Sequence, residues 1–206
     1  MPDKEKNQIQ NLQRNVVELS MAYDATIEGF ARAMDLREGE AEGHIHRVAE
    51  MAVDLAMAMG MAEADCQHIK RGAYLHDVGK MGIPDVILQK PGSLNDEETS
   101  FMRMHPQYAY DLLLPIPYLY LALDIPYRHH EKWDGSGYPD GLCGEQIPFP
   151  ARLFAVIDVY EAMTHNRPDR AAWSRQVALS HIQQSSGTLF DPAVVEAFLR
   201  VMRDKS

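Results

Sequence analysis

The sequence predicts an all-α fold, and three observations support this prediction. Apolar residues recur at intervals of three and four through most of the chain, which is the spacing of one face of a helix. No segment of useful length alternates apolar and polar residues in the manner of a half-buried strand. The longest stretch without helical spacing, residues 131–150, is rich in glycine and proline and is expected to be a long, ordered loop.

The composition is that of a globular chain with an acidic surface. Its 206 residues are 46% hydrophobic, which is enough for one well-buried core. Acidic residues number 30 and basic residues 20, and the resulting formal charge of −10 repels a nucleic-acid backbone. No polymeric nucleic-acid partner is therefore expected. A small phosphorylated ligand stays compatible with this charge, because bound metal ions reverse the field inside a pocket.

Three further features concern the compartment. Cys66 and Cys143 lack the spacing of a zinc or redox motif and are expected to be reduced. The polar N-terminal segment lacks the apolar core of a signal peptide. The most apolar stretch, which starts at Leu112, is interrupted by three prolines and by Asp124, so it predicts no membrane-spanning helix. We expect a cytoplasmic protein without membrane insertion.

The first residues predict a helix with the seam of a coiled coil. Apolar side chains follow alternating steps of four and three residues at Ile9, Leu12, Val16, Leu19 and Tyr23. Such a stripe either pairs with a second copy of the chain, giving a homodimer, or packs on the chain's own domain. Three heptads do not decide between these alternatives. We assign residues 1–22 to an N-terminal, coiled-coil-like linker helix.

Helices are predicted for most of residues 23–206. Runs with helical spacing cover residues 24–34, 40–61 and 62–76, and Gly60 is a stop signal for the second of them. The segment that follows, residues 79–94, contains several glycines and prolines and predicts an ordered loop.

Capping signals mark the helices of the second half. Asn95 with Glu98 has the pattern of a capping box, opening a helix to about Leu113 that Pro106 is expected to interrupt. The remaining helices are predicted at residues 117–130, 151–163 and 171–185, and from the N-cap Asp191 with Pro192 at its first position.

Nine histidines are the main candidates for chemistry, and their neighbours separate them. His46, His68 and His181 are interpreted as ordinary surface or hydrogen-bonded residues. His76 and Asp77 are adjacent at the end of an apolar helix, where a buried imidazole and carboxylate need a metal ion, a salt bridge or each other. The other candidates are His44, which follows Glu40 by one helical turn, and His105, His129, His130 and Asp158.

These residue types predict a metal centre with more than one ion. Five histidines and two aspartates offer mixed nitrogen and oxygen ligands, which suit iron, manganese or zinc better than calcium or magnesium. Seven ligands exceed what one ion normally binds. The set therefore predicts at least two ions, with a carboxylate such as Asp77 bridging them.

Four motifs together give the chain a recognisable resemblance. They are, in order, LHDVGKMGIPDVILQKPG, MHP, HHEKWDGSGYPDGLCGEQIP and ARLFAVIDVYEAMTHNRP. In these motifs the chain resembles the HD-GYP family of the HD phosphohydrolase superfamily, from about Tyr23 to Phe198. The resemblance implies an HD-domain-like helical bundle over residues 23–206. It also implies a bacterial phosphodiesterase that hydrolyses cyclic di-GMP to pGpG or GMP, with two or three iron or manganese ions.

The resemblance also assigns roles to individual residues. Residues matching the family's metal ligands are Glu40, His44, His76, Asp77, His105, His129, His130 and Asp158, with Asp77 shared and Glu40 implying a third ion. A metal-bridged hydroxide would be the nucleophile, with Asp77 and Lys80 at the catalytic centre. Residues matching substrate contacts are Lys80, Tyr138, Arg167 and Arg170. For the loop around Tyr138, the resemblance also implies contacts with diguanylate cyclase domains.

Two positions depart from the family pattern. Glu161 stands where an aspartate is common, and Asp169 stands where a tyrosine is usual beside the two arginines. Neither change removes a predicted metal ligand. Two alternatives stay open at this point: a catalytically slow module that binds cyclic di-GMP or a cyclase domain, and an HD hydrolase of another phosphoester.

Overall fold

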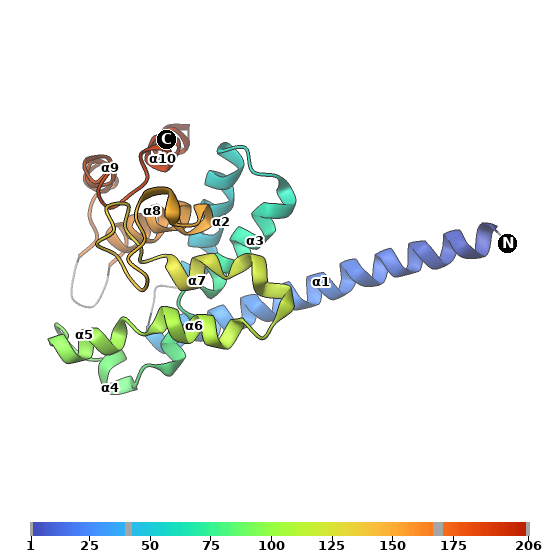
Figure 1. The fold of residues 1–206 in the computed structure, drawn as a ribbon, viewed down its shortest axis with the longest axis horizontal. Coiled ribbons are helices and arrows are strands. Elements are labelled where there is room, and N and C mark those ends of the chain that lie inside the picture. Colours follow the sequence, from blue (N-terminus) through green and yellow to red (C-terminus); the bar gives the residue numbers. More distant parts are fainter. Residues whose placement is uncertain (1, 40–42, 167–170, 205–206) are drawn as a thin grey trace.

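The structure, a computed structural model, describes residues 2–39, 43–166 and 171–204 (Figure 1). Within these ranges the regular elements are helices, and β pairing is limited to isolated bridges such as that between Asp134 and Cys143. The all-α prediction is confirmed. The α-helices are α1 (Pro2–Glu38), α2 (His44–Ala58), α3 (Glu63–Leu75), α4 (Asp85–Leu88), α5 (Asp96–Met102), α6 (His105–Leu113), α7 (Asp124–Arg128), α8 (Phe149–Thr164), α9 (Arg175–Gln184) and α10 (Pro192–Asp204). Three short 3₁₀ helices are η1 (Val78–Gly82), η2 (Pro117–Ala122) and η3 (Gly144–Gln146).

Helix α1 is continuous through the predicted boundary at residue 23. Its first half extends away from the remaining helices (Figure 1), and its second half packs on them through Ile27, Ala31 and Met34. The seam side chains from Ile9 to Leu19 are exposed and do not pack on the chain's own domain, whereas the Tyr23 ring contacts Tyr118, with 5.0 Å between the centroids. Packing on the own domain therefore accounts only for the last residue of the stripe. The division into residues 1–22 and 23–206 stays a prediction.

The core lies between α2, α3 and α8. Helix α2 contacts both of the others, while α10 covers α2 and α8 (Figure 1). Ala49 and Ala52 of α2 have no exposed surface, and such small side chains allow close approach of the neighbouring helices. Phe154 and Ile157 of α8 are equally buried, and each contributes about 1.5–3 kcal/mol through burial of its side chain. This core fixes the end of α3, where the His76–Asp77 pair lies.

Several of the predicted helix boundaries differ from those of the structure. Of the helix predicted over residues 40–61, residues 40–42 lie outside the described residues; α2 begins at His44, after the N-cap Gly43, whose φ of 77° is a left-handed conformation. The interruption predicted near Pro106 in the helix over residues 95–113 is confirmed, since α5 ends at Met102 and α6 begins at His105. The loop predicted over residues 79–94 contains η1 and α4.

The stretch predicted as one helix over residues 117–130 consists of η2 and α7. Both capping predictions are confirmed. Asn95 and Glu98 form a reciprocal capping box, and the Asp191 carboxylate accepts a hydrogen bond from the Ala193 N–H at 2.8 Å.

Cys66 and Cys143 are free thiols. Among the described residues, no helix combines the length and apolar character needed to cross a membrane.

Candidate metal centre

The His76–Asp77 pair lies where α3 ends and η1 begins. The His76 ring is buried and rests on Phe154, with 5.0 Å between the ring centroids. Its Nδ1–H donates to the Ala73 carbonyl at 2.8 Å, which leaves Nε2 with a lone pair in the neutral ring. Nε2 lies 3.1 Å from Asp77 Oδ2, yet it has no hydrogen bond of acceptable geometry. A buried nitrogen without a hydrogen-bond partner is a position that a metal ion satisfies.

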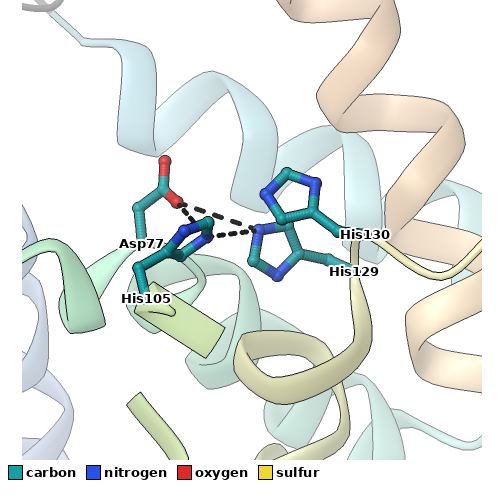
Figure 2. A group of neighbouring side chains, drawn as sticks. All are labelled: Asp77, His105, His129 and His130. Atoms are coloured by element: carbon teal, nitrogen blue, oxygen red, sulfur yellow. Dashed lines mark hydrogen bonds and ion pairs between the residues drawn. The ribbon is translucent and has the colours of Figure 1, made fainter. Parts of the chain in front are cut away.

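Asp77 also belongs to a four-residue cluster with three histidines from other segments (Figure 2). His105 opens α6, and its Nε2 is 3.3 Å from Asp77 Oδ1. His129 follows α7, and its Nε2 is 3.8 Å from the same oxygen. His130 completes the group, whose ligand atoms all lie within 4.8 Å of one another. Three segments distant in the sequence therefore meet at one carboxylate.

Backbone carbonyls orient the histidines of the cluster as they orient His76. His105 Nδ1–H donates to the Met102 carbonyl at 2.8 Å, and His129 Nδ1–H donates to the Ile125 carbonyl at 2.9 Å. In each neutral ring the Nε2 lone pair therefore faces Asp77. Metal-binding histidines usually have this arrangement, because the second hydrogen bond fixes the tautomer and the ring orientation. The site fits a divalent ion that prefers mixed nitrogen and oxygen ligands.

The electrostatics of the cluster also favour a cation. Burial lowers the pKa of His129 to about 4 and holds the pKa of His130 well below its usual range, so both rings stay neutral and able to bind metal near pH 7. Burial alone would raise the pKa of Asp77, but Lys80 and His76 outweigh it and keep that carboxyl ionised. Burial disfavours a charged His76, yet Asp77 raises its pKa to about 9. A positive charge between His76 and Asp77 is thus stabilised.

Lys80 is held beside Asp77 by two carboxylates. Its ammonium nitrogen is 2.6 Å from Asp77 Oδ2 and 2.6 Å from Glu38 Oε2 of α1. Burial opposes the charged lysine, but Asp77 and Glu38 overcome this effect and raise the pKa of Lys80. An ammonium has three N–H donors, of which these two carboxylates take two. Sequence reasoning missed Glu38, although it stands only two residues before the predicted ligand Glu40.

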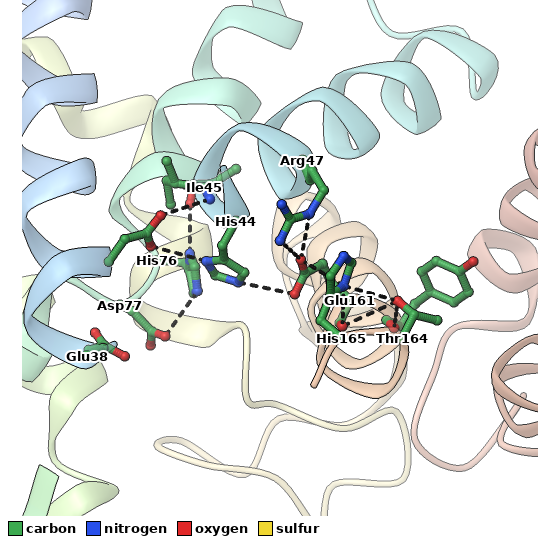
Figure 3. Close-up of polar contacts among 12 residues, drawn as sticks. Glu38, His44, Ile45, Arg47, His76, Asp77, Glu161, Thr164 and His165 are labelled. Atoms are coloured by element: carbon green, nitrogen blue, oxygen red, sulfur yellow. Dashed lines mark hydrogen bonds and ion pairs between the residues drawn. The ribbon is translucent and has the colours of Figure 1, made fainter. Parts of the chain in front are cut away.

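His44 lies beside the cluster and faces two carboxylates (Figure 3). Its Nδ1 is 3.2 Å from Asp35 Oδ1 of α1, and its Nε2 is 3.4 Å from Glu161 Oε2 of α8. The His44 and His76 ring centroids are 6.0 Å apart. The structure therefore brings His44 to the His76 side of the site, outside the four-residue group. Asp35, which sequence reasoning also missed, fixes both His44 and the Ile45 N–H at 3.2 Å.

Glu161, the residue that departs from the family pattern, is buried and paired. Its Oε1 accepts hydrogen bonds from Arg47 Nε and Nη2 at 3.0 and 2.8 Å, which joins α8 to α2 (Figure 3). The same oxygen is 3.1 Å from His165 Nδ1. Such partners compensate the cost of burying a carboxylate. The longer side chain is accommodated without unpaired charge.

The other predicted site residues fall into two groups. Asp158 is partly buried on α8, and its negative charge adds to that of Asp77 in raising the pKa of His76. Glu40, Arg167, Asp169 and Arg170 lie outside the described residues, so their roles as a third-metal ligand or substrate contacts stay predictions.

The loop of residues 131–150 covers the histidines. The Tyr138 ring stacks on His130, with 4.8 Å between centroids and 27° between planes, and the Arg103 guanidinium carbon lies 5.2 Å from the Tyr138 ring centroid. Gly137 passes so close to the chain that a Cβ there would lie 2.4 Å from the Lys132 nitrogen. A side chain at residue 137 would therefore displace the loop. Arg103 was not identified from the sequence, although it lies two residues before His105.

The buried carboxylate of Glu131 holds this loop from inside. Its Oε1 accepts from the N–H groups of Asp140 at 2.7 Å and Gly141 at 3.1 Å, and its Oε2 accepts from the N–H of Leu142 at 3.1 Å. Hydrogen bonds to a charged acceptor are roughly twice as strong as neutral ones. Glu131 therefore fixes the segment that directly follows Tyr138. Its position immediately after His130 was the only sequence signal for this role.

Replacing Glu131 by glutamine is expected to loosen the loop. The amide would place an N–H₂ group opposite a backbone N–H, and the chain would lose about 2 kcal/mol of stability, within the range for hydrogen bonds to charged groups. Denaturant unfolding measures this loss, and hydrogen exchange at Asp140, Gly141 and Leu142 should accelerate. Glu145→Gln, an exposed carboxylate of the same loop, is the control. Equal stability of the two variants would show that Glu131 does not anchor the loop.

The match to a known protein family covers most of the chain, including the cluster. The family described as HD domain matches residues 28–194. The chain belongs to the HD-domain family. Its HD domain contains both halves of the site described above, His44 with His76 and Asp77 with the three later histidines.

Relatives of this HD domain include enzymes that act on cyclic dinucleotides. The chain is 39% identical over 193 residues to the cyclic di-GMP phosphodiesterase response regulator RpfG of Xanthomonas campestris, covering 93% of this chain and 51% of that protein. It is 36% identical over 186 residues to the 3'3'-cGAMP-specific phosphodiesterase 2 of Vibrio cholerae, covering 89% and 36%. The chain thus spans about half the length, or less, of these relatives.

A solved structure supports the fold of the HD domain. The crystal structure of a cyclic GMP-AMP specific phosphodiesterase of Vibrio cholerae, V-cGAP3, matches with a TM-score of 0.69 at 18% sequence identity. The match covers 87% of this chain and 48% of that one. At this identity the likeness concerns the helical architecture, and it confirms the predicted HD-domain-like bundle.

Proposed function

We propose that this chain is a metal-dependent phosphodiesterase that hydrolyses cyclic di-GMP to pGpG or GMP. The observation that carries the proposal is the convergence of His76, His105 and His129 on the Asp77 carboxylate, each through Nε2, the ring nitrogen that does not donate to a backbone carbonyl. The choice of substrate rests on the relatives named as cyclic di-GMP phosphodiesterases, such as the Thermotoga maritima protein at 40% identity over 172 residues.

The ligands divide between two sides of Asp77. We assign His105, His129 and His130 to one ion, and His44, His76 and Asp158 to a second, with Asp77 shared. Glu40 is assigned to a third ion. Iron or manganese ions at these positions would supply Lewis acidity and an activated water for attack on phosphorus. The protein's contribution is to hold the ligands apart from bulk water, on the apolar surface that Phe154 provides beneath His76 and His129.

Other residues are assigned to the substrate. Lys80 keeps one N–H donor beyond those bound by Asp77 and Glu38, and this donor suits a phosphate oxygen. Tyr138, stacked on His130, presents an aromatic ring to the space beside the ligands. Arg167 and Arg170 are proposed to bind the other phosphate, because a guanidinium pairs with phosphate through two parallel hydrogen bonds. The exposed part of the same loop is proposed as the contact for diguanylate cyclase domains.

The test combines metal analysis with product analysis. Protein purified without oxygen is assayed for bound iron and manganese, then incubated separately with cyclic di-GMP and with 3'3'-cGAMP. Two or three ions per chain with pGpG or GMP released from cyclic di-GMP is the expected result. Hydrolysis of cGAMP alone would reassign the substrate. Binding of cyclic di-GMP by metal-loaded protein without any product would support a signalling module, and absence of metal after reconstitution would overturn the site.

A further inference from the structure

The side chains in the first half of α1 are not buried by the other described elements. Every residue from Lys4 to Leu19 is exposed, and the helix projects well beyond the other elements (Figure 1). An isolated helix of this length is marginal in water, because helices in proteins gain most of their stability from packing of an apolar face. The helical state of this segment therefore calls for a partner along its length.

The exposed apolar side chains of α1 form one seam with heptad spacing. Positions a and d of successive heptads are occupied by Ile9, Leu12, Val16, Leu19, Tyr23, Thr26 and Phe30, and all seven are exposed. Their exposed fractions include 56% for Ile9, 66% for Val16 and 54% for Phe30. Ile27 and Met34, which pack α1 on the domain together with Ala31, fall at position e and border the seam on one side. The seam is defined as these seven residues; its side chains from Ile9 to Leu19 are exposed, and Tyr23 borders the domain, with its ring centroid 5.0 Å from that of Tyr118.

The composition of the seam specifies what kind of helix fits it. Its a positions include β-branched Ile9 and Val16, and its first two d positions are Leu12 and Leu19. This distribution favours parallel coiled coils of two strands over trimers and tetramers. A partner with the same sequence satisfies it in register. The seam is therefore self-complementary.

The residues that flank the seam also permit pairing of identical chains. In a parallel pair, Gln8 at position g faces the partner's Gln13 at position e, and Asn15 faces the partner's Ser20 in the same way. These amides and hydroxyls can hydrogen-bond to one another and bring no like charges together. The charged pair Arg14 and Glu18, 3.4 Å apart, lies away from the seam. Self-association therefore meets no electrostatic opposition at the flanks.

The seam continues into an apolar groove of the domain. Tyr23, Thr26 and Phe30 of α1 line a cavity of about 580 Å³ that Met81 and Ile116 of the domain also line. Phe30, Met81 and Ile116 are exposed. A second helix lying along the seam covers this wall as well, so the exposed apolar surface of helix and groove is buried by one occupant.

We propose that the occupant is a second copy of this chain, paired through α1 in a parallel, two-stranded coiled coil from Ile9 to Phe30. The full chain is then a dimer whose metal centres lie on the same end of the coil. This proposal is independent of the reaction that the chain catalyses.

Sedimentation equilibrium of the full chain tests the stoichiometry. The expected mass is twice the chain mass of 23.3 kDa, and Leu12→Asp with Leu19→Asp should return it to that of one chain. Val17→Asp with Met21→Asp is the matched control, because these side chains are 57% and 67% exposed on the same helix but outside the seam. The control should stay dimeric. A wild-type monomer at high micromolar concentration, or equal dissociation by both pairs of substitutions, would overturn the proposal.

Cysteine cross-linking tests the orientation. In a Cys143→Ser background, which leaves only the buried Cys66, Ile9→Cys and Tyr23→Cys are oxidised separately and as a mixture. A parallel, in-register pair gives a disulfide dimer for each variant alone. Cross-links that form only between Cys at residue 9 and Cys at residue 23 would show an antiparallel pair and would contradict the proposed geometry.

Discussion

Asp77→Ala is expected to remove bound metal and phosphodiesterase turnover together. The Asp77 carboxylate contacts both sides of the site, at 3.1 Å from His76 Nε2 and 3.3 Å from His105 Nε2. Changes to residues that only support metal ligands typically cost about 10- to 100-fold in metal affinity. Loss of a shared ligand is therefore expected to cost more than about 100-fold. It also leaves the Lys80 ammonium without one of its two counter-charges.

Metal content per chain and turnover of cyclic di-GMP measure this effect, and both should fall. Asp111→Ala provides the matched control, because Asp111 is an exposed carboxylate of α6 that contacts only Gln107 among the described residues. Circular dichroism of both variants checks that the helices remain. An Asp77→Ala protein that retains its metal and its activity would disprove the shared-ligand arrangement.

Gly79→Ala is expected to destabilise the chain and to separate His105 from Asp77. A Cβ at residue 79 would lie 1.8 Å from the His105 carbonyl oxygen and 2.6 Å from the Ala109 nitrogen. Both atoms belong to the backbone of α6, so relief requires movement of the whole helix. Overpacking typically costs about 1–3 kcal/mol, and contact with backbone places Gly79→Ala at or above the upper end of that range.

Denaturant unfolding of metal-free protein measures the loss at residue 79, and metal titration measures its effect on the site. Gly29→Ala is the control, since Gly29 lies in α1 with no atom within 4 Å of the added Cβ. Alanine there should raise stability by about 0.5–1 kcal/mol because glycine is a poor helix former. If Gly79→Ala proves as stable as Gly29→Ala, α6 does not pack on η1 as described.

The predicted helices could be found from the sequence wherever local signals decided the structure. Asn95 with Glu98, and Asp191 with Pro192, mark helix starts through hydrogen bonds within four residues, and both were confirmed. The break between α5 and α6 occurs at Arg103, before Pro106, because proline has no N–H to continue the hydrogen bonding of α5 and is tolerated in the first turn of the next helix. The continuity of α1 was not predictable from its apolar spacing, because exposed apolar residues such as Phe30 alternate with buried ones such as Ile27 and Ala31 along the same stretch.

In the site too, local signals identified some residues and left others unidentified. Adjacent pairs such as His76 with Asp77 and His129 with His130 were identifiable because buried polar neighbours are unusual in an apolar context. The residues that hold them in place were not identifiable in this way. Glu38, Glu131 and Asp35 act through contacts with groups 9 to 42 residues away, and an isolated glutamate or aspartate in a polar segment gives no sign of such a partner.

Helix α1 has a mechanical consequence for the metal centre. At about 1.5 Å per residue, roughly 40 Å of unbroken helix separates Ile9 from Asp35 and Glu38, which contact His44 and Lys80. Helix α1 is continuous over this length, Gly29 included, and contains no proline between Ile9 and Glu38, so a movement of its far end reaches its last turn. A small rotation of α1 about its own axis would shift these two carboxylates against the ligands.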